Sequence, residues 1–322
     1  MQIVKKENYK DLKLNKIKKK ILSFTSSIFH EMILFEDSMN KNTFFILENQ
    51  KIIAVVPLYF EKNFDSQKIK IGSYLNLSIP GPIILENFNE KKFKKLVSLI
   101  LNEIDSIAKA QNVKKLKINF SDTISYQVGS QKYFSLLEKL SANKFKSLFS
   151  IGLRIDLKKK YNEIFKNFSK GHKSEIKKQS LEEYCFFNYE EKKLEYKDFL
   201  SLLSHSKRNN NDNKMLYELF KKNKVYIVFS KKEEKEFFCC LFTLAGNTVE
   251  YFFSKSSLNH HSLIVSAINF FKKFDYLKFM NLGVLTTLDN FEPQTQKKKN
   301  IALFKKGFGG EKFKYIFFEK EY

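Results

Sequence analysis

Long apolar runs are absent from this sequence, and none approaches the roughly 20 consecutive residues that a membrane-spanning helix requires. Residues 1–6 also lack the apolar stretch of a secretory signal peptide. Cysteine is scarce, with three in 322 residues and none at metal-ligand spacing. The adjacent Cys239 and Cys240 point to opposite faces of a predicted strand and are therefore poor disulfide partners. These absences predict a cytoplasmic protein without a structural metal ion.

Arginine is rarer still, since only Arg154 and Arg208 among the 58 basic residues are arginines. The formal net charge is +23, and such a field attracts anions such as nucleotides, coenzyme A, nucleic acid or acidic membrane. The alternative is a compositional bias toward lysine, in which most lysines are simply solvated surface. No long basic tract with interleaved aromatic residues marks a nucleic-acid groove, so DNA is not an expected partner.

Apolar and aromatic residues are abundant, at 43% and 16%, and the length allows two domains. The first half predicts a hairpin, a strand, a helix with one buried stripe, another strand and a second helix. Their ranges are 44–47 with 52–60, 69–77, 93–108, 113–120 and 131–143. Residues 1–40 are predicted to be mixed and mainly helical, on weak signals.

The second half repeats a related order of elements, although not of residue identities. The predicted ranges are a strand at 151–157, helical material at 162–183, a strand at 186–189, helices at 198–206 and 214–222, strands at 225–229, 237–245 and 249–254, a helix at 262–274 and a strand at 277–282. A long loop and an apolar strand ending at Phe318 complete the chain. We therefore expect an α/β protein with mixed α+β sheets and two domains, residues 1–150 and 151–322.

A polar loop connects the strand at 249–254 to the helix that follows it. The first N–H groups of a helix lack partners within it and carry the positive end of its dipole, so this position suits a phosphate or pyrophosphate. Four residues would supply charge, hydroxyl and amide contacts there: Lys255, Ser256, Ser257 and Asn259. The alternative is an ordinary N-cap loop, because the glycines of a P-loop are missing.

The neighbouring His260 and His261 invite a metal or general-base interpretation. Adjacent histidines do not form a helical ligand pair, and no carboxylate lies at a matched spacing. His172 and His205 are far away in the sequence, and no Ser/His/Asp or Cys/His signature is present. We predict exposed loop histidines without a catalytic role.

The segment at 304–311, FKKGFGGE, is the most distinctive of the chain. Its three glycines imply backbone at positive φ or a strand that another group approaches closely. The functional interpretation is a lysine presented to a phosphate or carboxylate beside an open backbone. The alternative is a glycine bulge within a C-terminal strand.

This segment resembles the FK-x-GFGG ending of FemAB/FemX-type transferases and their CelD-like relatives in the GNAT superfamily. Three other segments agree with the resemblance. NFSKGHKSEIKK at 167–178 is similar to the S-x-x-HR-x-x-I-R-x-A helix of that family. Residues 263–274 with YLKFMNLG at 276–283 look like its helix and y-D-l-G strand. Residues 52–58 with Gly81 and Pro82 are similar to its G-x-x-v-a-v-x-P-L…GP pattern.

The resemblance implies two tandem GNAT-like domains and transfer of an acyl group to an amine of a cell-envelope precursor, such as an amino sugar or a peptidoglycan peptide. The implied donor is acetyl-CoA or another acyl-CoA, or else aminoacyl-tRNA, as in a peptidoglycan-bridge ligase. Two residues depart from the pattern: Lys173 replaces an arginine and loses a bidentate donor, and Asn281 replaces an aspartate and removes a negative charge. The long helical arm that several members use for tRNA is not evident, which leaves an acyl-CoA donor at least as plausible.

Acyl transfer requires deprotonation of the acceptor amine and stabilisation of the charge that develops on the carbonyl oxygen. Backbone N–H groups of a splayed strand near 249–253 would polarise the carbonyl. Glu250 or Tyr251 would accept or relay the proton, and strand alternation lets only one of them face the site. Lys305 would hold an anionic part of donor or acceptor, with Arg208 as a second candidate.

Three residues of the matching segments are also expected to bind substrate: His172, Lys173 and Phe304. The expected partner is an anionic small-molecule or lipid-linked acceptor, with tRNA and a peripheral membrane contact as further options. A different class of function also stays open, a non-catalytic basic protein that binds nucleic acid or anionic lipid. Such a protein would show steep salt dependence spread over many lysines.

Overall fold

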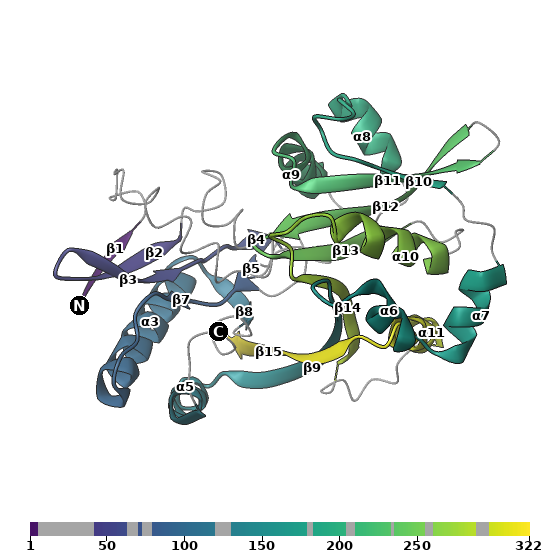
Figure 1. The fold of residues 1–322 in the computed structure, drawn as a ribbon. Helices are drawn as coiled ribbons and strands as arrows, with labels where there is room; N and C mark the ends of the chain where they lie inside the picture. Colours follow the sequence, from purple (N-terminus) through teal and green to yellow (C-terminus); the bar gives the residue numbers. More distant parts are fainter. Residues whose placement is uncertain are drawn as a thin grey trace. The chain divides into compact units, whose positions relative to one another are not determined.

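The computed structural model of the chain describes residues 1–5, 42–62, 70–72, 79–119, 130–178, 183–203, 210–232, 235–254, 260–287 and 296–322 (Figure 1). The chain divides into two units: one is Met1–Ser150 with Lys314–Tyr322, and the other is Ile151–Phe313. It passes from the first unit to the second inside strand β9 (Lys146–Asp156) and returns inside β15 (Glu311–Glu321). Among the described residues, no helix is long and apolar enough to cross a membrane.

The first unit contains a four-stranded sheet in the order β1-β2-β3-β7. These strands are β1 Gln2–Lys5, β2 Phe44–Glu48, β3 Lys51–Val56 and β7 Ile83–Ile84. The predicted hairpin is formed by β2 and β3, and its turn residues Asn49 and Gln50 both have positive φ, 48° and 62°, as a two-residue type I′ turn requires. Strand β1 shows that the helical prediction is wrong for residues 2–5, and residues 6–40 lie outside the described residues.

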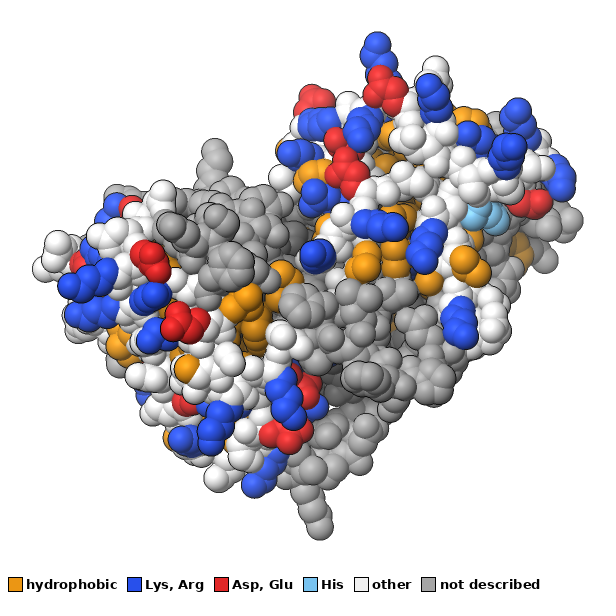
Figure 2. Space-filling model, turned by 90° about the horizontal axis from the view of Figure 1, so that it is seen from below, with side chains coloured by type: hydrophobic (Ala, Val, Ile, Leu, Met, Phe, Trp, Pro, Cys, Tyr) orange, Lys and Arg blue, Asp and Glu red, His pale blue; other side chains and the backbone are white. Residues whose placement is uncertain are grey.

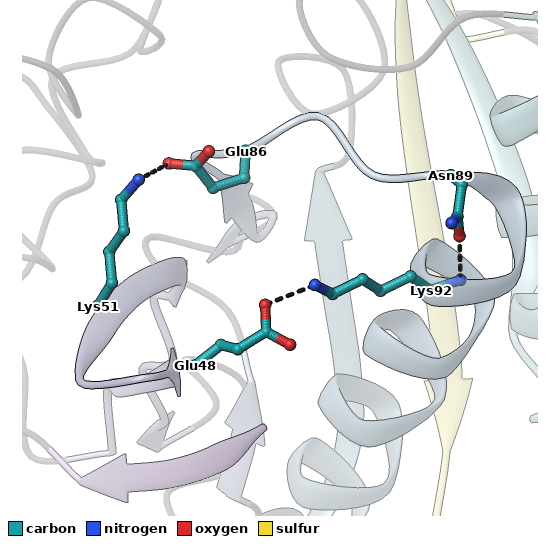
Figure 3. Close-up of polar contacts among 5 residues, drawn as sticks. All are labelled: Glu48, Lys51, Glu86, Asn89 and Lys92. Carbon is teal, nitrogen blue, oxygen red and sulfur yellow. Dashed lines mark hydrogen bonds and ion pairs between the residues drawn. The ribbon is translucent and has the colours of Figure 1, made fainter.

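Helix α3 (Glu90–Ala110) carries the apolar stripe that its spacing predicts. The buried residues of the stripe are Phe93, Leu96, Val97, Ile100, Leu101, Ile104, Ile107 and Ala108. The helix begins where the Asn89 side chain accepts a hydrogen bond of 2.9 Å from the Lys92 N–H. The Lys92 ammonium also reaches Glu48 beside the hairpin turn at 2.6 Å, which joins the hairpin to the helix (Figure 3).

The first unit also contains strands in the order β15-β8-β5-β4, with β6 paired to β8 as well. Their bounds are β4 Glu61–Lys62, β5 Lys70–Gly72, β6 Ile79–Pro80 and β8 Val113–Asn119, and helix α5 (Ser130–Ala142) packs against α3. At the end of β15, Lys320 forms an ion pair with Asp105 of α3. The Tyr322 hydroxyl donates to the same carboxylate at 2.6 Å, so two side chains of the last strand converge on one residue of the helix.

The second unit is built on a mixed sheet in which strands follow the order β10-β11-β12-β13-β14, with β9 beyond β14. These strands are β10 Glu183–Phe187, β11 Val225–Lys232, β12 Lys235–Ala245, β13 Thr248–Ser254 and β14 Phe279–Thr287. The first four pair antiparallel with one another, and Gly246 (φ 55°) with Asn247 forms the turn between β12 and β13. Strand β14 is parallel to β13, because a helix carries the chain back between them.

The helices of this unit are α6 Tyr161–Lys166, α7 Lys170–Lys178, α8 Tyr196–Leu202, α9 Asn210–Lys221, α10 His260–Phe271 and α11 Gln296–Lys306. Helix α10 buries Leu263 and Phe271 in one apolar cluster with Met280 of β14. Helix α11 corrects the prediction of a long loop before the glycine-rich segment. Residues 304–306 form its last turn instead of part of a bulged strand.

Candidate active site at the fork between two parallel strands

Strands β13 and β14 are paired only where they begin. Their register joins residues 248–250 to residues 279–281 and ends at the pair of Glu250 and Asn281. Beyond that pair β13 continues to Ser254, still bonded to β12, while β14 continues to Thr287 (Figure 1). No ladder joins the two described strands there, and strand edges that are not joined to each other in this way can pair with another extended chain. We call this opening, residues 250–254 and 281–287, the fork.

Strand β13 carries a bulge at the fork. The register with β12 shifts between the pairs Phe242–Tyr251 and Leu241–Phe253, which makes Phe252 the extra residue. A bulge bends its strand and re-aims the backbone groups next to it. The N–H groups that the sequence analysis assigned to carbonyl polarisation therefore lie on an irregular strand edge.

Glu250 and Tyr251 point to opposite faces of β13. Glu250 is opposite Thr243 of β12 and Asn281 of β14, so these three side chains form a row on one face. Tyr251 is on the other face, where its ring packs 5.4 Å from that of Phe242 and against the apolar core. Burial raises the pKa of Tyr251 far above its ordinary value. Of the two residues expected to handle the proton, Glu250 is therefore the one on the face of the row.

Lys305, in the last turn of α11, reaches over β14. Its Nζ donates to the Val284 carbonyl at 3.1 Å and lies 3.1 Å from the position of a Cβ added to Gly283. Gly283 has φ 83°, a conformation that glycine adopts without strain. Burial lowers the pKa of Lys305, and the charge of Glu250 opposes that shift. The structure thus brings Glu250 and Lys305, two of the three predicted catalytic residues, together at the fork.

Two of the glycines after α11 are explained by the close approach of other backbone segments. A Cβ added to Gly309 would lie 1.9 Å from the Asn167 carbonyl oxygen, and Gly309 also has φ 60°. A Cβ added to Gly310 would lie 2.5 Å from the Arg154 carbonyl oxygen. The glycines therefore permit dense packing within the unit, whereas the helix before them presents the lysine.

His172 of α7 holds the last turn of α11. Its Nε2 lies 2.8 Å from the Phe304 carbonyl oxygen, and because a carbonyl only accepts, Nε2 carries the proton. Nδ1 then accepts from the Ser169 hydroxyl at 3.1 Å. The ring lies against Gly307, where an added Cβ would be 2.0 Å from Cε1. Burial lowers the pKa of His172, and the bond to Phe304 opposes this shift only in part. The lowered pKa favours the neutral form of the ring.

The other residues expected to bind substrate also make contacts within the protein. The Phe304 ring lies 5.5 Å from that of His172 and 5.1 Å from that of His261. His261 is in the first turn of α10, and its ring is 4.4 Å from that of His172, which corrects the prediction of an exposed loop histidine. Lys173 donates to the Lys166 carbonyl at the end of α6, at 2.8 Å. His172, His261 and Phe304 therefore support the turn that carries Lys305, whereas Lys173 contacts only the end of α6.

A surface hollow with an empty volume of about 260 Å³ adjoins the glycine turn. Phe308 and Gly309 contribute to its lining, with Asp156, Lys159 and Glu311 as the charged residues. Lys159 and Glu311 form an ion pair at 3.2 Å, so these two charges of the hollow are paired with each other.

Several expectations fall beyond the residues that the structure places. Five predicted binding residues lie outside the described residues: Arg208, Lys255, Ser256, Ser257 and Asn259. In the described part of the chain, no group of three or more His, Cys, Asp or Glu side chains could hold a metal ion. Asn281 of the row is not among the site residues predicted from the sequence, where it appears only as a departure from a family pattern. Its signal was a polar residue within the otherwise apolar stretch at 279–282.

Two α/β units, the second with parallel strands that part after three paired residues, define a tandem GNAT-like fold. The crystal structure of FemX is similar to this chain with a TM-score of 0.58, covering 87% of each chain at 12% identity. A tandem GNAT protein from the clavulanic acid biosynthesis pathway, solved without AcCoA, gives a TM-score of 0.50, covering 87% of this chain and 82% of its own at 6% identity. L-PGS from Bacillus licheniformis also gives 0.50, covering 95% of this chain and 90% of its own at 12% identity.

No family model and no curated protein matches the sequence. At such low identities the likeness to solved structures shows the fold alone. At that level the predicted fold class, two tandem GNAT-like domains with mixed sheets, is confirmed, and so is the predicted resemblance to FemX.

Proposed function

We propose that the protein is an N-acyltransferase that moves an acyl group from an acyl-CoA to an amine of a cell-envelope precursor. The reaction class is supported by the fold shared with FemX and with a tandem GNAT protein. The envelope precursor is supported by the motifs similar to those of FemAB/FemX-type transferases. The observation that carries the proposal is the fork, where the carboxylate of Glu250 and the ammonium of Lys305 lie beside strand edges without a ladder between them.

The fork would hold the donor as an added strand. Peptide groups beyond the Glu250–Asn281 pair are able to bond the amide groups of an extended acyl-CoA arm, as a sheet edge binds a peptide. The bulge at Phe252 would aim an N–H group of β13 at the thioester carbonyl. One such donor, fixed before the reaction starts, contributes about 3–4 kcal/mol of transition-state stabilisation in other acyl-transfer enzymes.

Glu250 would accept the proton of the acceptor ammonium. The freed amine nitrogen attacks the thioester carbonyl, so that the C–N bond forms and the C–S bond breaks. The nitrogen gives its second proton to the departing thiolate, and Glu250 releases the first proton to solvent. Lys305 balances the charge of Glu250 and binds an anionic part of the acceptor or donor. Holding the amine and the thioester together at the fork supplies much of the remaining rate, because a reaction between two molecules becomes a reaction within one complex.

The test compares Lys305→Ala with Lys306→Ala, since Lys306 is the next residue of the same helix and is exposed. Acyl transfer from acetyl-CoA to a panel of amino sugars and peptidoglycan stem peptides is followed by mass spectrometry. We expect Lys305→Ala to lower the rate roughly 10²-fold or more, the effect of removing one preorganised charge donor, and Lys306→Ala to leave it unchanged. Equal activity of the two variants would contradict the assigned role of Lys305.

Aminoacyl-tRNA is the alternative donor, favoured by the TM-score of 0.58 with FemX combined with the resemblance of the motifs. Thermal-shift titrations with acyl-CoA thioesters and with charged tRNA separate the two, because a ligand that binds only the native state raises the melting temperature. Binding of charged tRNA without binding of any acyl-CoA would replace the first proposal.

A non-catalytic basic protein is the alternative from another class. Lys and Arg side chains are scattered over the face shown in Figure 2 and do not gather in one stripe. For such a protein we would expect nucleic acid or anionic vesicles to bind with steep salt dependence, and mutation of Lys305 alone to change little.

A further inference from the structure

Helix α11 exposes its large aliphatic side chains and buries a small one. Leu303 is 63% exposed and Ile301 is 44% exposed, whereas Ala302 between them is buried. A helix of a globular protein normally shows the reverse pattern, with its large apolar residues directed at the core. Five large apolar side chains are exposed among the residues that the structure describes, and this one helix carries two of them. The outward face of α11 is therefore not explained by packing within the unit.

Lysines flank both exposed side chains. Lys299 and Lys306 lie four residues before and three residues after Leu303, on the same face of the helix, and both are exposed. Lys297 lies four residues before Ile301 and is exposed as well. The sequence of α11, QKKKNIALFKK, contains no aspartate or glutamate. The exposed surface of α11 thus combines apolar side chains with positive charge.

Helix α7 lies beside α11 and extends the positive surface (Figure 1). The bond between His172 and the Phe304 carbonyl joins the two helices, and the Ser169 N–H donates to the Gly307 carbonyl at 2.8 Å. Together α7 and α11 contain nine lysines and one carboxylate, that of Glu175, in 20 residues. The other 302 residues contain 49 basic and 34 acidic residues. A lysine bias of the whole chain does not account for this local excess. We call residues 170–178 and 296–306 the basic platform.

The chemistry of the basic platform favours an anionic lipid surface over a nucleic acid. Interfacial helices insert apolar side chains at the boundary between headgroups and acyl chains, while their lysines contact the anionic headgroups. Single-stranded nucleic acid is bound instead by aromatic rings on which its bases stack, and arginine is the residue suited to bidentate phosphate contacts. The platform contains no arginine, and its one phenylalanine, Phe304, packs its ring against those of His172 and His261.

We propose that the basic platform docks the protein on an anionic membrane surface. Leu303 and Ile301 enter the headgroup region, and the lysines of α7 and α11 contact the lipid phosphates. Docking itself does not depend on the proposed acyl transfer. Lys305 belongs to the same helix, so docking brings the fork close to the headgroups and makes a lipid-linked amine the acceptor; this last step rests on the proposed function.

The absence of tryptophan from the sequence allows a local optical test. Leu303→Trp places a single fluorophore on the platform. Tyr276→Trp is the matched control, because Tyr276 is 54% exposed and lies in the loop between α10 and β14. Each full-length variant is titrated with vesicles of phosphatidylcholine, with vesicles of equal parts phosphatidylcholine and phosphatidylglycerol, and with bulk tRNA. The emission maximum and the quenching by brominated lipids are recorded.

Two further variants separate the charge from the apolar contact, and their vesicle partitioning is measured by co-sedimentation. Lys299→Gln combined with Lys306→Gln removes two charges of the platform. Its control combines Lys91→Gln with Lys95→Gln, which removes two exposed lysines of α3. Leu303→Gln removes the apolar contact at nearly constant helix propensity. Melting temperatures establish that each variant is folded.

We expect the emission of Leu303→Trp to shift to the blue and to be quenched with the anionic vesicles alone, and that of Tyr276→Trp to stay unchanged. A lysine close to an anionic surface changes partitioning about fivefold, so the platform double variant should bind roughly 30-fold more weakly at low salt, whereas the α3 control should bind as wild type. Leu303→Gln should weaken binding roughly tenfold.

Unchanged emission of Leu303→Trp with every vesicle, or equal losses in the platform and α3 variants, would overturn the proposal. A response to tRNA alone would assign the platform to a nucleic acid instead. None of these measurements involves turnover, so their failure is distinct from failure of the proposed function. A protein that docks on vesicles but transfers no acyl group would keep the docking surface and lose the transferase assignment.

Discussion

Replacement of His172 by phenylalanine should loosen the turn that carries Lys305 while preserving the ring packing. A phenyl ring can still lie against Gly307 and Phe308, whose ring is 4.6 Å from that of His172. It cannot donate to the Phe304 carbonyl or accept from the Ser169 hydroxyl, the two bonds of 2.8 and 3.1 Å. At about 0.5–1.5 kcal/mol for each bond, the second unit should lose about 1–3 kcal/mol of stability.

The same substitution should change how stability depends on pH. The pKa of His172 is lowered below its ordinary value of 6.5, first by burial, while the bond to Phe304 opposes the shift. The unfolded chain therefore takes up a proton at higher pH than the folded chain. The contribution of neutral His172 is complete above pH 6.5 and is lost as the pH falls through 6.5 and then through the folded pKa. The difference between wild type and variant should therefore shrink toward pH 5.

Hydrogen exchange of peptides covering residues 168–178 and 303–310 measures this locally, which is useful because the chain contains no tryptophan for fluorescence. The adjacent Lys173→Gln is the control, since it removes one bond to the Lys166 carbonyl and does not touch α11. If both peptides exchange equally in wild type and His172→Phe at pH 7.5, His172 does not hold the turn. If the variant keeps the full acid dependence of the wild type, another group is responsible for it.

Two further predictions concern stability and are measured by urea denaturation followed by circular dichroism. Gly309→Ala should lower the free energy of unfolding by more than 2 kcal/mol, roughly the sum of a positive-φ penalty and a backbone clash. Gly171→Ala in helix α7, where an added Cβ meets nothing within 4 Å, should instead raise it by about 0.5–1 kcal/mol. Equal effects of the two variants would contradict the packing explanation. Asp105→Asn should lower the free energy of unfolding by about 3–5 kcal/mol, because it leaves the Lys320 ammonium, 11% exposed, without its counter-ion. Tyr322→Phe removes one hydrogen bond to the same carboxylate and should lower it by about 1 kcal/mol. Similar losses for both variants would show that the ion pair contributes little to stability.

Elements with a clear local pattern could be predicted from the sequence. Helix α3 and the hairpin of β2 and β3 follow from apolar spacing and from Asn49 at the turn, which are properties of neighbouring residues. Helix α11 could not be predicted in the same way. Among the side chains of its sequence, QKKKNIALFKK, whose burial the structure describes, only that of Ala302 is fully buried. The helix therefore lacks an apolar stripe and depends on contacts with β14 and α7. The return of residues 314–322 to the first unit also has no local signature.

The sequence allowed several residues of the candidate site to be predicted, but not how they are arranged in space. The sequence does not show whether Glu250 or Tyr251 faces the site. The register with β12 and β14 shows that Glu250 does, in a row with Thr243 and Asn281. The contact between His172 and His261 joins two helices that are far apart in the chain, so spacing could not reveal it. Asn281 was visible as a departure from a family pattern, but its burial follows from the neighbouring strands.

The glycine-rich segment that carries the resemblance is a support for the site and is separate from its chemistry. Its glycines admit the Asn167 and Arg154 carbonyls and the His172 ring, and these contacts fix where α11 ends. Because α11 ends there, Lys305 lies over Gly283 and within reach of the charge of Glu250. A chain with the same glycines but without a carboxylate at that strand position would keep the turn and lose the charge pair. The glycine-rich segment therefore fixes the position of Lys305, whereas the residues of the fork determine which groups Lys305 can contact.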